Sequence, residues 1–317
     1  MKKFFLKCIF FTAIVIFCQV IIARYTLPRI PELALLDQYL RDKYQIIYIG
    51  DSAIRSTAKS DRDKSSIVEM LARIYPSGAI GDLSHGAYHL GIYEAFLKHI
   101  AKSSIKPRAV ILPINLRSFS PGWDMLPAYQ FEREQFYFTA PSFVTYFFKP
   151  LAILRAINLN TVTDAEYMQL PVYYGKEKVG KVSDFDNFQK YSATSTENIR
   201  NKFIFDYMYS LDKNHRKLKS LNIIVDTATQ AGIKVYIYIH PIDFRAGEKY
   251  IGPDFVRQVT ANTDTICLVL MEKALPCVNL ALQLDSGYFN YESYPNEHLN
   301  EKGRKFIAEE VNRFFLK

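Results

Sequence analysis

The chain has 317 residues, of which 49% are hydrophobic and 23% charged, and its formal net charge at pH 7 is +8. This composition is that of a globular protein, long enough for one large core or for one domain with an insertion. Lysines and arginines are scattered rather than clustered, which argues against a nucleic-acid partner. At most, the positive charge favours a mild attraction to anionic lipid or an anionic glycan.

Residues 1–23 combine a basic start with a long apolar run. Lys2, Lys3 and Lys7 precede or begin an apolar stretch that continues to Ala23. The pattern fits either a cleaved signal peptide or an uncleaved signal-anchor, and its poor cleavage signal favours the anchor. Because ~20 helical residues span a bilayer core, we expect a single-pass transmembrane helix over 1–23. A spacer and helix over 24–43 would follow, with the remaining domain in the periplasm or outside the cell.

After residue 44, short runs of β-branched and aromatic residues alternate with longer segments of helical periodicity. We expect strands at 46–49, 79–83, 109–114, 234–239 and 277–282. We expect helices at 33–40, 65–74, 88–100, 199–231 with a break near Asn214, 255–274 and 306–315. This alternation predicts an α/β domain over 44–317, a three-layer α/β/α architecture with a parallel, flavodoxin-like sheet of about five strands.

The stretch at about 120–199 departs from the alternation of strands and helices. Its first half is rich in Phe and Tyr, and its second half is polar and rich in turn residues. We interpret it as an insertion whose aromatic residues form its own core. The alternatives are a lid over the site, a platform on which sugars stack, or a surface at the lipid interface.

The cysteines and histidines carry no signature of a metal or a cofactor. Cys267 and Cys277 either form a disulfide, if the domain is exported, or remain two buried thiols. No metal-ligand spacing is present, and we predict neither a metal nor a cofactor.

Ser52 is the first candidate functional residue. The strand at 46–49 ends at Gly50, and Asp51 and Ser52 follow directly. Open α/β sheets bind ligands at the carboxyl ends of their strands, so this turn suits a nucleophile. A helix beginning directly behind Ser52 would also aim free N–H groups at developing negative charge. The alternative is that Asp51 or Ser52 only caps a helix.

Other candidate residues follow the next strands and are expected at the same edge of the sheet. Gly86 follows 79–83 and lacks a Cβ that would keep its N–H from a ligand. Asn115 follows 109–114 and can donate a hydrogen bond. His240 follows 234–239 and is a second candidate base or a substrate-binding residue. Each also has an ordinary alternative as a turn residue or a structural histidine. Arg117 either binds substrate or forms a salt bridge.

Taken in order, Gly50-Asp51-Ser52, Gly86, Asn115 and His298 resemble the sequence blocks of the SGNH (GDSL-type) hydrolases. The resemblance extends from about residue 44 to the C-terminus, apart from the insertion. It implies that Ser52 attacks an acyl ester and that His298 is its base. The N–H groups of Ser52 and Gly86 and the side chain of Asn115 would form the oxyanion hole.

One position departs from the family pattern. The family usually has an Asp three residues before its catalytic His, where this chain has Pro295. We predict that Glu292 takes the place of that carboxylate, with Asp285 as the alternative and Glu297 as the least suitable. The further alternatives are a Ser–His dyad and an inactive site.

The resemblance implies a serine esterase or O-acyltransferase that acts on an acylated glycan or lipid of the cell envelope. Membrane-anchored members of the family that modify the cell envelope have a similar layout, and a membrane acyltransferase is a candidate partner. The alternative is a catalytically inactive SGNH-fold protein that binds or assembles partners in polysaccharide modification, which the missing Asp favours.

Overall fold

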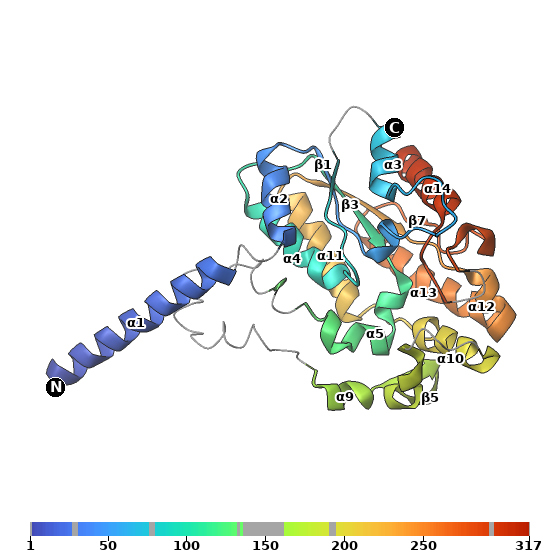
Figure 1. The fold of residues 1–317 in the computed structure, drawn as a ribbon, viewed down its shortest axis with the longest axis horizontal. Coiled ribbons are helices and arrows are strands. Elements are labelled where there is room, and N and C mark those ends of the chain that lie inside the picture. The colour runs from blue at the N-terminus through green and yellow to red at the C-terminus, as the bar shows by residue number, and fades with distance from the viewer. Residues whose placement is uncertain are drawn as a thin grey trace.

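The computed structural model describes residues 2–26, 31–75, 80–131, 134–135, 162–189, 195–291 and 295–316. Its centre is a sheet of five parallel strands (Figure 1). The strands are β1 (Ile46–Tyr48), β2 (Ile80–Asp82), β3 (Ala109–Ile114), β6 (Lys234–Ile239) and β7 (Val278–Asn279). Their spatial order is β2-β1-β3-β6-β7, which is the flavodoxin-like order that the alternation predicts. The prediction of an α/β fold with a parallel five-stranded sheet is therefore confirmed.

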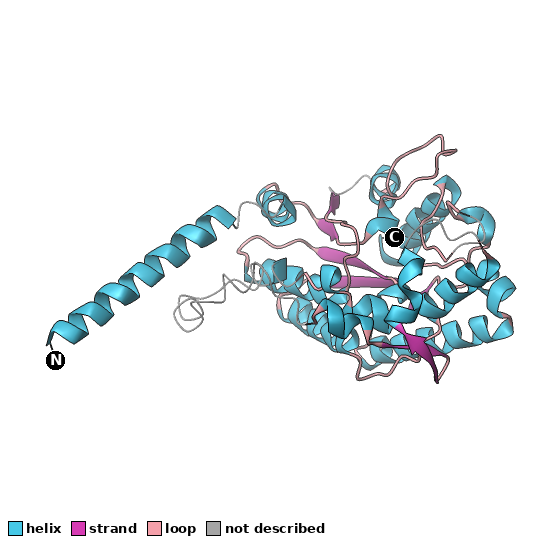
Figure 2. Cartoon of the chain, turned by 60° about the horizontal axis from the view of Figure 1, so that its bottom comes forward, coloured by secondary structure: helices cyan, strands magenta, loops and turns pink. Residues whose placement is uncertain are grey.

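The strands divide the hydrophobic core into two layers because alternate side chains point to opposite faces. Ile47 and Ile49 of the first strand segment join the larger cluster, and Ile46 and Tyr48 join the smaller one. The larger cluster lies under α2 (Pro31–Arg41), α4 (Leu90–Lys102), α11 (Arg216–Gln230) and α13 (Pro253–Glu272). The smaller cluster lies under α3 (Ile67–Ile74) and α14 (Glu301–Val311). Figure 2 shows the strands between helices on both sides.

Two helix predictions needed correction. The α-helix expected directly behind Ser52 is instead a single 3-10 turn, η2 (Ser52–Ile54), and α3 begins only at Ile67 with Ser66 as its cap. The closing helix begins at Glu301 rather than 306, because Asn300 caps it by accepting a hydrogen bond from the Gly303 N–H. Because a helix dipole requires several aligned peptide units, the single 3-10 turn at Ser52 provides no such dipole to stabilise negative charge there.

The long helical segment at 199–231 is broken as expected. It forms α10 (Thr196–Tyr207) and α11, with the interruption spanning Asn214. Beyond the end of α11, Gly232 adopts a φ of +72°, the left-handed conformation that favours glycine after a helix. Sequence periodicity did not predict α12 (Phe244–Ile251), which follows β6 directly.

Between β3 and α10 the described residues form small elements rather than further sheet layers. They are η3 (Leu116–Phe119), α5 (Pro121–Met125), η4 (Pro127–Tyr129), α9 (Asp164–Met168), the antiparallel pair β4 (Pro171–Tyr174) and β5 (Glu177–Lys181), and η5 (Val182–Gln189). Most of the aromatic stretch predicted as an insertion core, residues 132–133 and 136–161, lies outside the described residues. The short elements that end the described C-terminal region are η6 (Ser286–Tyr288) and the π-helical turn η7 (Asn312–Leu316).

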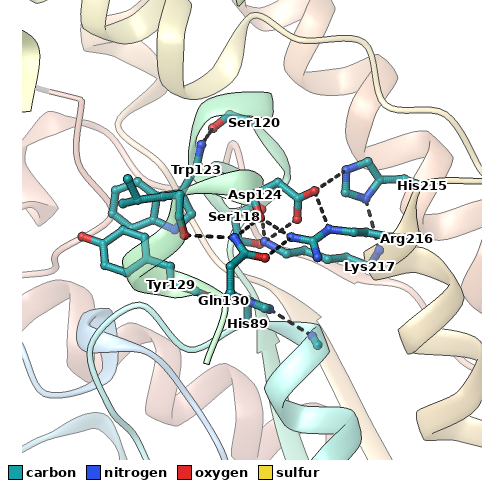
Figure 3. A network of polar contacts seen from close by, with 12 residues as sticks. His89, Ser118, Ser120, Trp123, Asp124, Tyr129, Gln130, His215, Arg216 and Lys217 are labelled. Carbon is teal, nitrogen blue, oxygen red and sulfur yellow. Dashed lines mark hydrogen bonds and ion pairs between the residues drawn. The ribbon is translucent and has the colours of Figure 1, made fainter. Parts of the chain in front are cut away.

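A buried polar network fastens the start of this region to α11. Asp124 on α5 lies between the side chains of His215, Arg216 and Lys217, which begin or precede α11 (Figure 3). Lys217 is almost completely buried and also donates a hydrogen bond to the Ser118 carbonyl on η3. The network therefore fixes η3 and α5 against the end of α11 that faces the carboxyl edge of the sheet.

At the N-terminus, α1 covers Lys2–Thr26, so the predicted helix is present. Among the described residues, however, no helix meets the length and hydropathy required to cross a bilayer. The membrane part of that prediction has no support from this structure. The two cysteines of the domain, Cys267 on α13 and Cys277 before β7, form a disulfide, which decides between the two alternatives for this pair.

Candidate active site

Ser52 and His298 meet at the carboxyl edge of the sheet although 246 positions separate them in sequence. The distance from Ser52 Oγ to His298 Nε2 is 3.1 Å, which is a hydrogen bond between a hydroxyl and an imidazole nitrogen. For Nε2 to accept the Ser52 proton, the neutral ring must carry its own hydrogen on Nδ1. This pair has the geometry of a nucleophile and its base.

The turn that carries Ser52 depends on its two preceding residues. A Cβ at Gly50 would lie 2.5 Å from Cγ1 of Ile54 and 2.9 Å from Oγ of Ser84, so the chain folds this tightly only with glycine. Asp51 caps η2, because its Oδ1 accepts a hydrogen bond of 2.9 Å from the Ala53 N–H. The alternative that one of these two residues is a helix cap therefore holds for Asp51. The Ser52 hydroxyl does not cap and is hydrogen-bonded to His298.

Asn115 is held beside Ser52 by two hydrogen bonds. Its Oδ1 accepts from the Arg117 N–H at 3.0 Å and caps η3, and its Nδ2 donates to Asp51 Oδ2 at 2.8 Å. These contacts fix which end of the amide faces the Ser52 turn. An amide NH₂ group has two hydrogens, so Nδ2 retains one donor beyond the bond to Asp51.

Gly86 lies on the exposed turn after β2, and that turn runs alongside the Ser52 loop. The His85 N–H donates to the Gly50 carbonyl at 3.1 Å, which brings the turn next to the end of β1. A Cβ at position 86 would meet no described atom within 4 Å. Packing among the described residues therefore does not require glycine at this position.

Arg117 and His240 contact Glu297 rather than Ser52. Arg117 forms a buried ion pair with the Glu297 carboxylate, and His240 donates from Nε2 to the Glu297 carbonyl oxygen at 3.0 Å. The salt bridge that sequence reasoning offered for Arg117 is thus present. His240 is fully buried behind the loop that carries His298, and burial lowers its pKa to about 4.

The electrostatic surroundings of His298 differ from those of a triad histidine. The pKa of His298 is lowered to about 4, chiefly by burial and also by the Arg117 guanidinium and the neighbouring His240, and Asp51 acts in the opposite direction. The ring is therefore neutral at pH 7 and able to accept a proton. Its imidazolium form has little stabilisation from the described residues.

The carboxylates considered as partners of the His298 ring are elsewhere or undescribed. Asp285 caps η6 by accepting from the Gly287 N–H at 2.9 Å, and Glu297 is paired with Arg117. Glu292 lies outside the described residues. Among the residues that the structure does describe, no carboxylate is hydrogen-bonded to the His298 ring.

Sequence reasoning missed two side chains that complete this site. Tyr207 donates to Glu297 Oε2 at 3.1 Å, and the Asp206 carboxylate lies 4.0 Å from Nε of Arg117. Both come from the last turn of α10. Neither stands in a motif, and ordinary helical periodicity covers both positions, so no sequence signal distinguished them.

No protein-family model and no curated protein matches the sequence. Solved structures of similar shape include a protein from Lactobacillus plantarum with a TM-score of 0.40 at 10% identity, covering 86% of this chain and 95% of that one. A carbohydrate acetylesterase family member from Sinorhizobium meliloti has a TM-score of 0.37 at 7% identity, with 85% and 96% covered. The aryl esterase of M. smegmatis has a TM-score of 0.36 at 9% identity, with 85% and 99% covered. At TM-scores this low, the activity must be argued from the residues of this chain.

Proposed function

We propose that this protein is a serine esterase or O-acyltransferase of the SGNH type, with Ser52 as nucleophile and His298 as base. The observation that carries the proposal is the 3.1 Å hydrogen bond between Ser52 Oγ and His298 Nε2. It supplies the nucleophile–base pair that acyl transfer requires. The Asn115 amide, oriented toward the same turn by Asp51, supports the proposal with a donor for the oxyanion.

The reaction has two proton-balanced halves. Ser52 Oγ attacks the ester carbonyl while its proton moves to His298 Nε2, and the negative charge on the carbonyl oxygen faces the N–H groups of Ser52 and Gly86 and the Asn115 amide. Collapse of this intermediate expels the alcohol, which takes the proton from His298, and leaves an acyl group on Ser52. A second hydroxyl, from water or from a sugar, then repeats the sequence in reverse and carries the acyl group away.

The proposal is tested with a fluorophosphonate probe and a chromogenic acetyl ester. Wild-type protein should be labelled at Ser52 and should hydrolyse the ester. Ser52→Ala should lose labelling and at least about 10³-fold in kcat, with an unchanged melting temperature. Ester turnover by Ser52→Ala at the wild-type rate would exclude this serine as the nucleophile. Labelling of a different residue would do the same.

Glu292 is the proposed carboxylate partner of His298. Orientation and tautomer of the base matter most in the transition state, so Glu292→Gln should lower kcat by up to about 10⁴-fold and leave KM nearly unchanged. Equal activity of Glu292→Gln and wild type would exclude Glu292 as this partner, and full activity of Asp285→Asn as well would leave Ser52 and His298 as a dyad.

The second candidate is a non-catalytic protein that binds an acylated glycan or takes part in its assembly. The observation that favours it is the environment of His298, with a pKa lowered to about 4 by burial and by nearby positive charge. Such a ring is a weak base. Absence of probe labelling, together with retention of glycan binding by Ser52→Ala, would favour this function over the first.

We further propose that the domain works outside the cytoplasm, attached through α1, on an acylated glycan or lipid of the cell envelope. The Cys267–Cys277 disulfide supports an oxidising compartment. The exposed apolar side chains of α1, such as Phe4, Phe10 and Phe17, support contact with lipid. Cell fractionation tests this placement, and a soluble mature protein that begins near residue 24 would contradict the attachment.

A further inference from the structure

The contact between Arg117 and Glu297 joins the two segments that carry the proposed active-site residues. Arg117 lies two residues after Asn115 on η3, and Glu297 directly precedes His298. Their side chains form an ion pair in which Arg117 is 11% exposed and Glu297 4% exposed. The Tyr207 hydroxyl donates to the same carboxylate oxygen at 3.1 Å, so the pair has a third partner from α10.

The main chain on both sides of His298 is also held. His240 donates to the Glu297 carbonyl at 3.0 Å, and the His298 N–H donates to Asn296 Oδ1 at 2.7 Å. The Asn290 N–H donates to the His298 carbonyl at 2.9 Å. By contrast, Ser52 is the only described side chain that is hydrogen-bonded to the His298 ring. Within the part of the chain that the structure describes, the position of this imidazole is therefore set through its backbone and its neighbour Glu297.

We propose that the Arg117–Glu297 ion pair is a positioning device for the His298 base. By tying the loop of His298 to the turn of Asn115, the pair sets the distance between base and oxyanion donor. In a catalytic triad, a carboxylate hydrogen-bonded to the ring orients the histidine. Here the ion pair orients the histidine through its backbone. This inference rests on the proposed function, because Arg117 and Glu297 themselves contact neither Ser52 nor the reacting atoms.

The positive charge of Arg117 also affects the pKa of His298. A carboxylate partner would stabilise the imidazolium, whereas the Arg117 guanidinium disfavours it. The other described groups that act on the ring are Asp51, which favours the imidazolium, and His240, which opposes it. The pair thus positions a neutral ring without making it a stronger base. Removing Arg117 should consequently raise the pKa of His298 while it loosens the position of the ring.

The test uses the full-length double variant Arg117→Met/Glu297→Gln. Removing one partner alone would leave a buried charge unpaired, which typically costs about 3–5 kcal/mol and risks the fold. The double variant removes both charges of the pair, keeps similar side-chain volumes and keeps a hydrogen-bond acceptor for Tyr207. The buried Asp206 carboxylate, which also faces Arg117, still has the charge of Lys202 acting on it. We expect kcat for an acetyl ester to fall about 10²-fold with KM within about twofold, as for a misplaced catalytic group. We also expect the acid limb of the pH–rate profile to move up from about 4.

The matched control is Lys217→Met/Asp124→Asn in the network of Figure 3. This ion pair is similarly buried, with 2% and 6% exposure, and its partners among the described residues do not include residues 296–298. Because Lys217 also holds the Ser118 carbonyl of η3, this control loosens η3 without touching Glu297. It should lower the melting temperature and kcat but leave the acid limb in place. An equal fall in kcat in both double variants, with no movement of the acid limb in either, would reduce Arg117 and Glu297 to a structural role.

An NMR titration of the His298 ring separates this inference from the proposed function. In wild-type protein the ring should show one tautomer and a pKa near 4, and in the Arg117→Met/Glu297→Gln variant it should show mixed tautomers and a higher pKa. If the wild type has no Ser52-dependent activity, the proposed function fails, and the titration still decides the positioning role. Identical titration curves for the two proteins would overturn it.

Discussion

The two ends of the parallel sheet contain different kinds of side chain. At the carboxyl ends of β1, β3 and β6 lie Ser52, Asn115 and His240, with His298 beside them. Near the amino end of β6 lies an apolar hollow of about 420 Å³, lined by residues such as Val225, Tyr236 and Phe315. The Tyr236 and Phe315 rings stack there with centroids 4.9 Å apart. We interpret the first end as the site of function and the second as a source of stability.

Topology explains much of this asymmetry before function is considered. Each helix returns antiparallel to the strands, so helix N-termini and strand carboxyl ends share one edge of the sheet. Free N–H groups at those N-termini need side-chain acceptors. His89 and His215 supply them for α4 and α11, and Ser66 and Asn300 for α3 and α14. Polar residues at this edge are therefore expected in any such fold, and only the bond from Ser52 to His298 singles out a reactive pair.

The largest expected difference between the two ends of the sheet is the loss of catalysis when Asn115 at the carboxyl end is replaced. Asn115→Ala removes a proposed oxyanion donor and should lower kcat about 10²–10³-fold. It also removes the donor to the buried Asp51 carboxylate, so we expect about 1–3 kcal/mol of lost stability. Steady-state kinetics and denaturant unfolding measure the two effects. If kcat stays within threefold, Asn115 is only a cap for η3.

At the amino end, the expected effect is on stability alone. Phe315 is 8% exposed and Phe314 is 47% exposed, so the neighbouring residues form a matched pair. Phe315→Ala should cost about 3 kcal/mol in the free energy of unfolding because it empties a packed position. Phe314→Ala should cost less than about 1 kcal/mol. Neither variant should change kcat/KM of the folded protein, and a tenfold loss in either would mean that this end also serves the site.

The buried histidines make the carboxyl end sensitive to acid. Burial lowers the pKa values of His215, His240 and His298 to about 4, and that of His89 lies well below its ordinary value. The unfolded chain binds protons on these residues near pH 6.5, whereas the folded chain does so only at lower pH. Their contribution to stability is thus complete above about pH 6.5 and is lost as pH falls toward 4, with a slope of up to about 1.4 kcal/mol per pH unit for each histidine.

Thermal unfolding from pH 7.5 to 4 measures this loss. His215→Asn retains a side-chain acceptor for the Lys217 N–H and removes one titrating group. The free energy of unfolding of this variant should therefore depend less steeply on pH, by the uptake of up to one proton on unfolding. A flat profile in the wild type between pH 6.5 and 4 would contradict the assignment of buried neutral histidines.

The smallest expected effect is at Asp285. Its carboxylate caps η6, and asparagine can cap equally well, so Asp285→Asn should leave both kcat and stability within experimental error. Asp285→Ala should cost about 1 kcal/mol of stability without a loss of kcat. A strong fall in kcat in Asp285→Asn would instead make this residue the partner of His298 and displace Glu292.

Local patterns were sufficient to predict most of the framework. The five strands were recognisable as short β-branched runs, and the break in the long helical segment was recognisable at Asn214. The order of the strand-end residues placed Ser52, Gly86 and Asn115 on one edge. Prediction failed behind Ser52, where a 3-10 turn replaces an α-helix, because the Asp51 cap and the packing of Gly50 against Ile54 act over only a few residues.

By itself, the sequence determined the α/β alternation, the two-sided burial of the strands and the candidate nucleophile, since these follow from periodicity and from residues next to one another in the chain. The family resemblance predicted His298 as the base of Ser52, and the tertiary structure brings the two side chains together. Only the tertiary structure decided that Asp51 holds Asn115 and that Arg117 pairs with Glu297. These contacts join residues separated by 64 positions or more. The backbone path between such residues, rather than any local preference, brings their side chains within hydrogen-bonding distance.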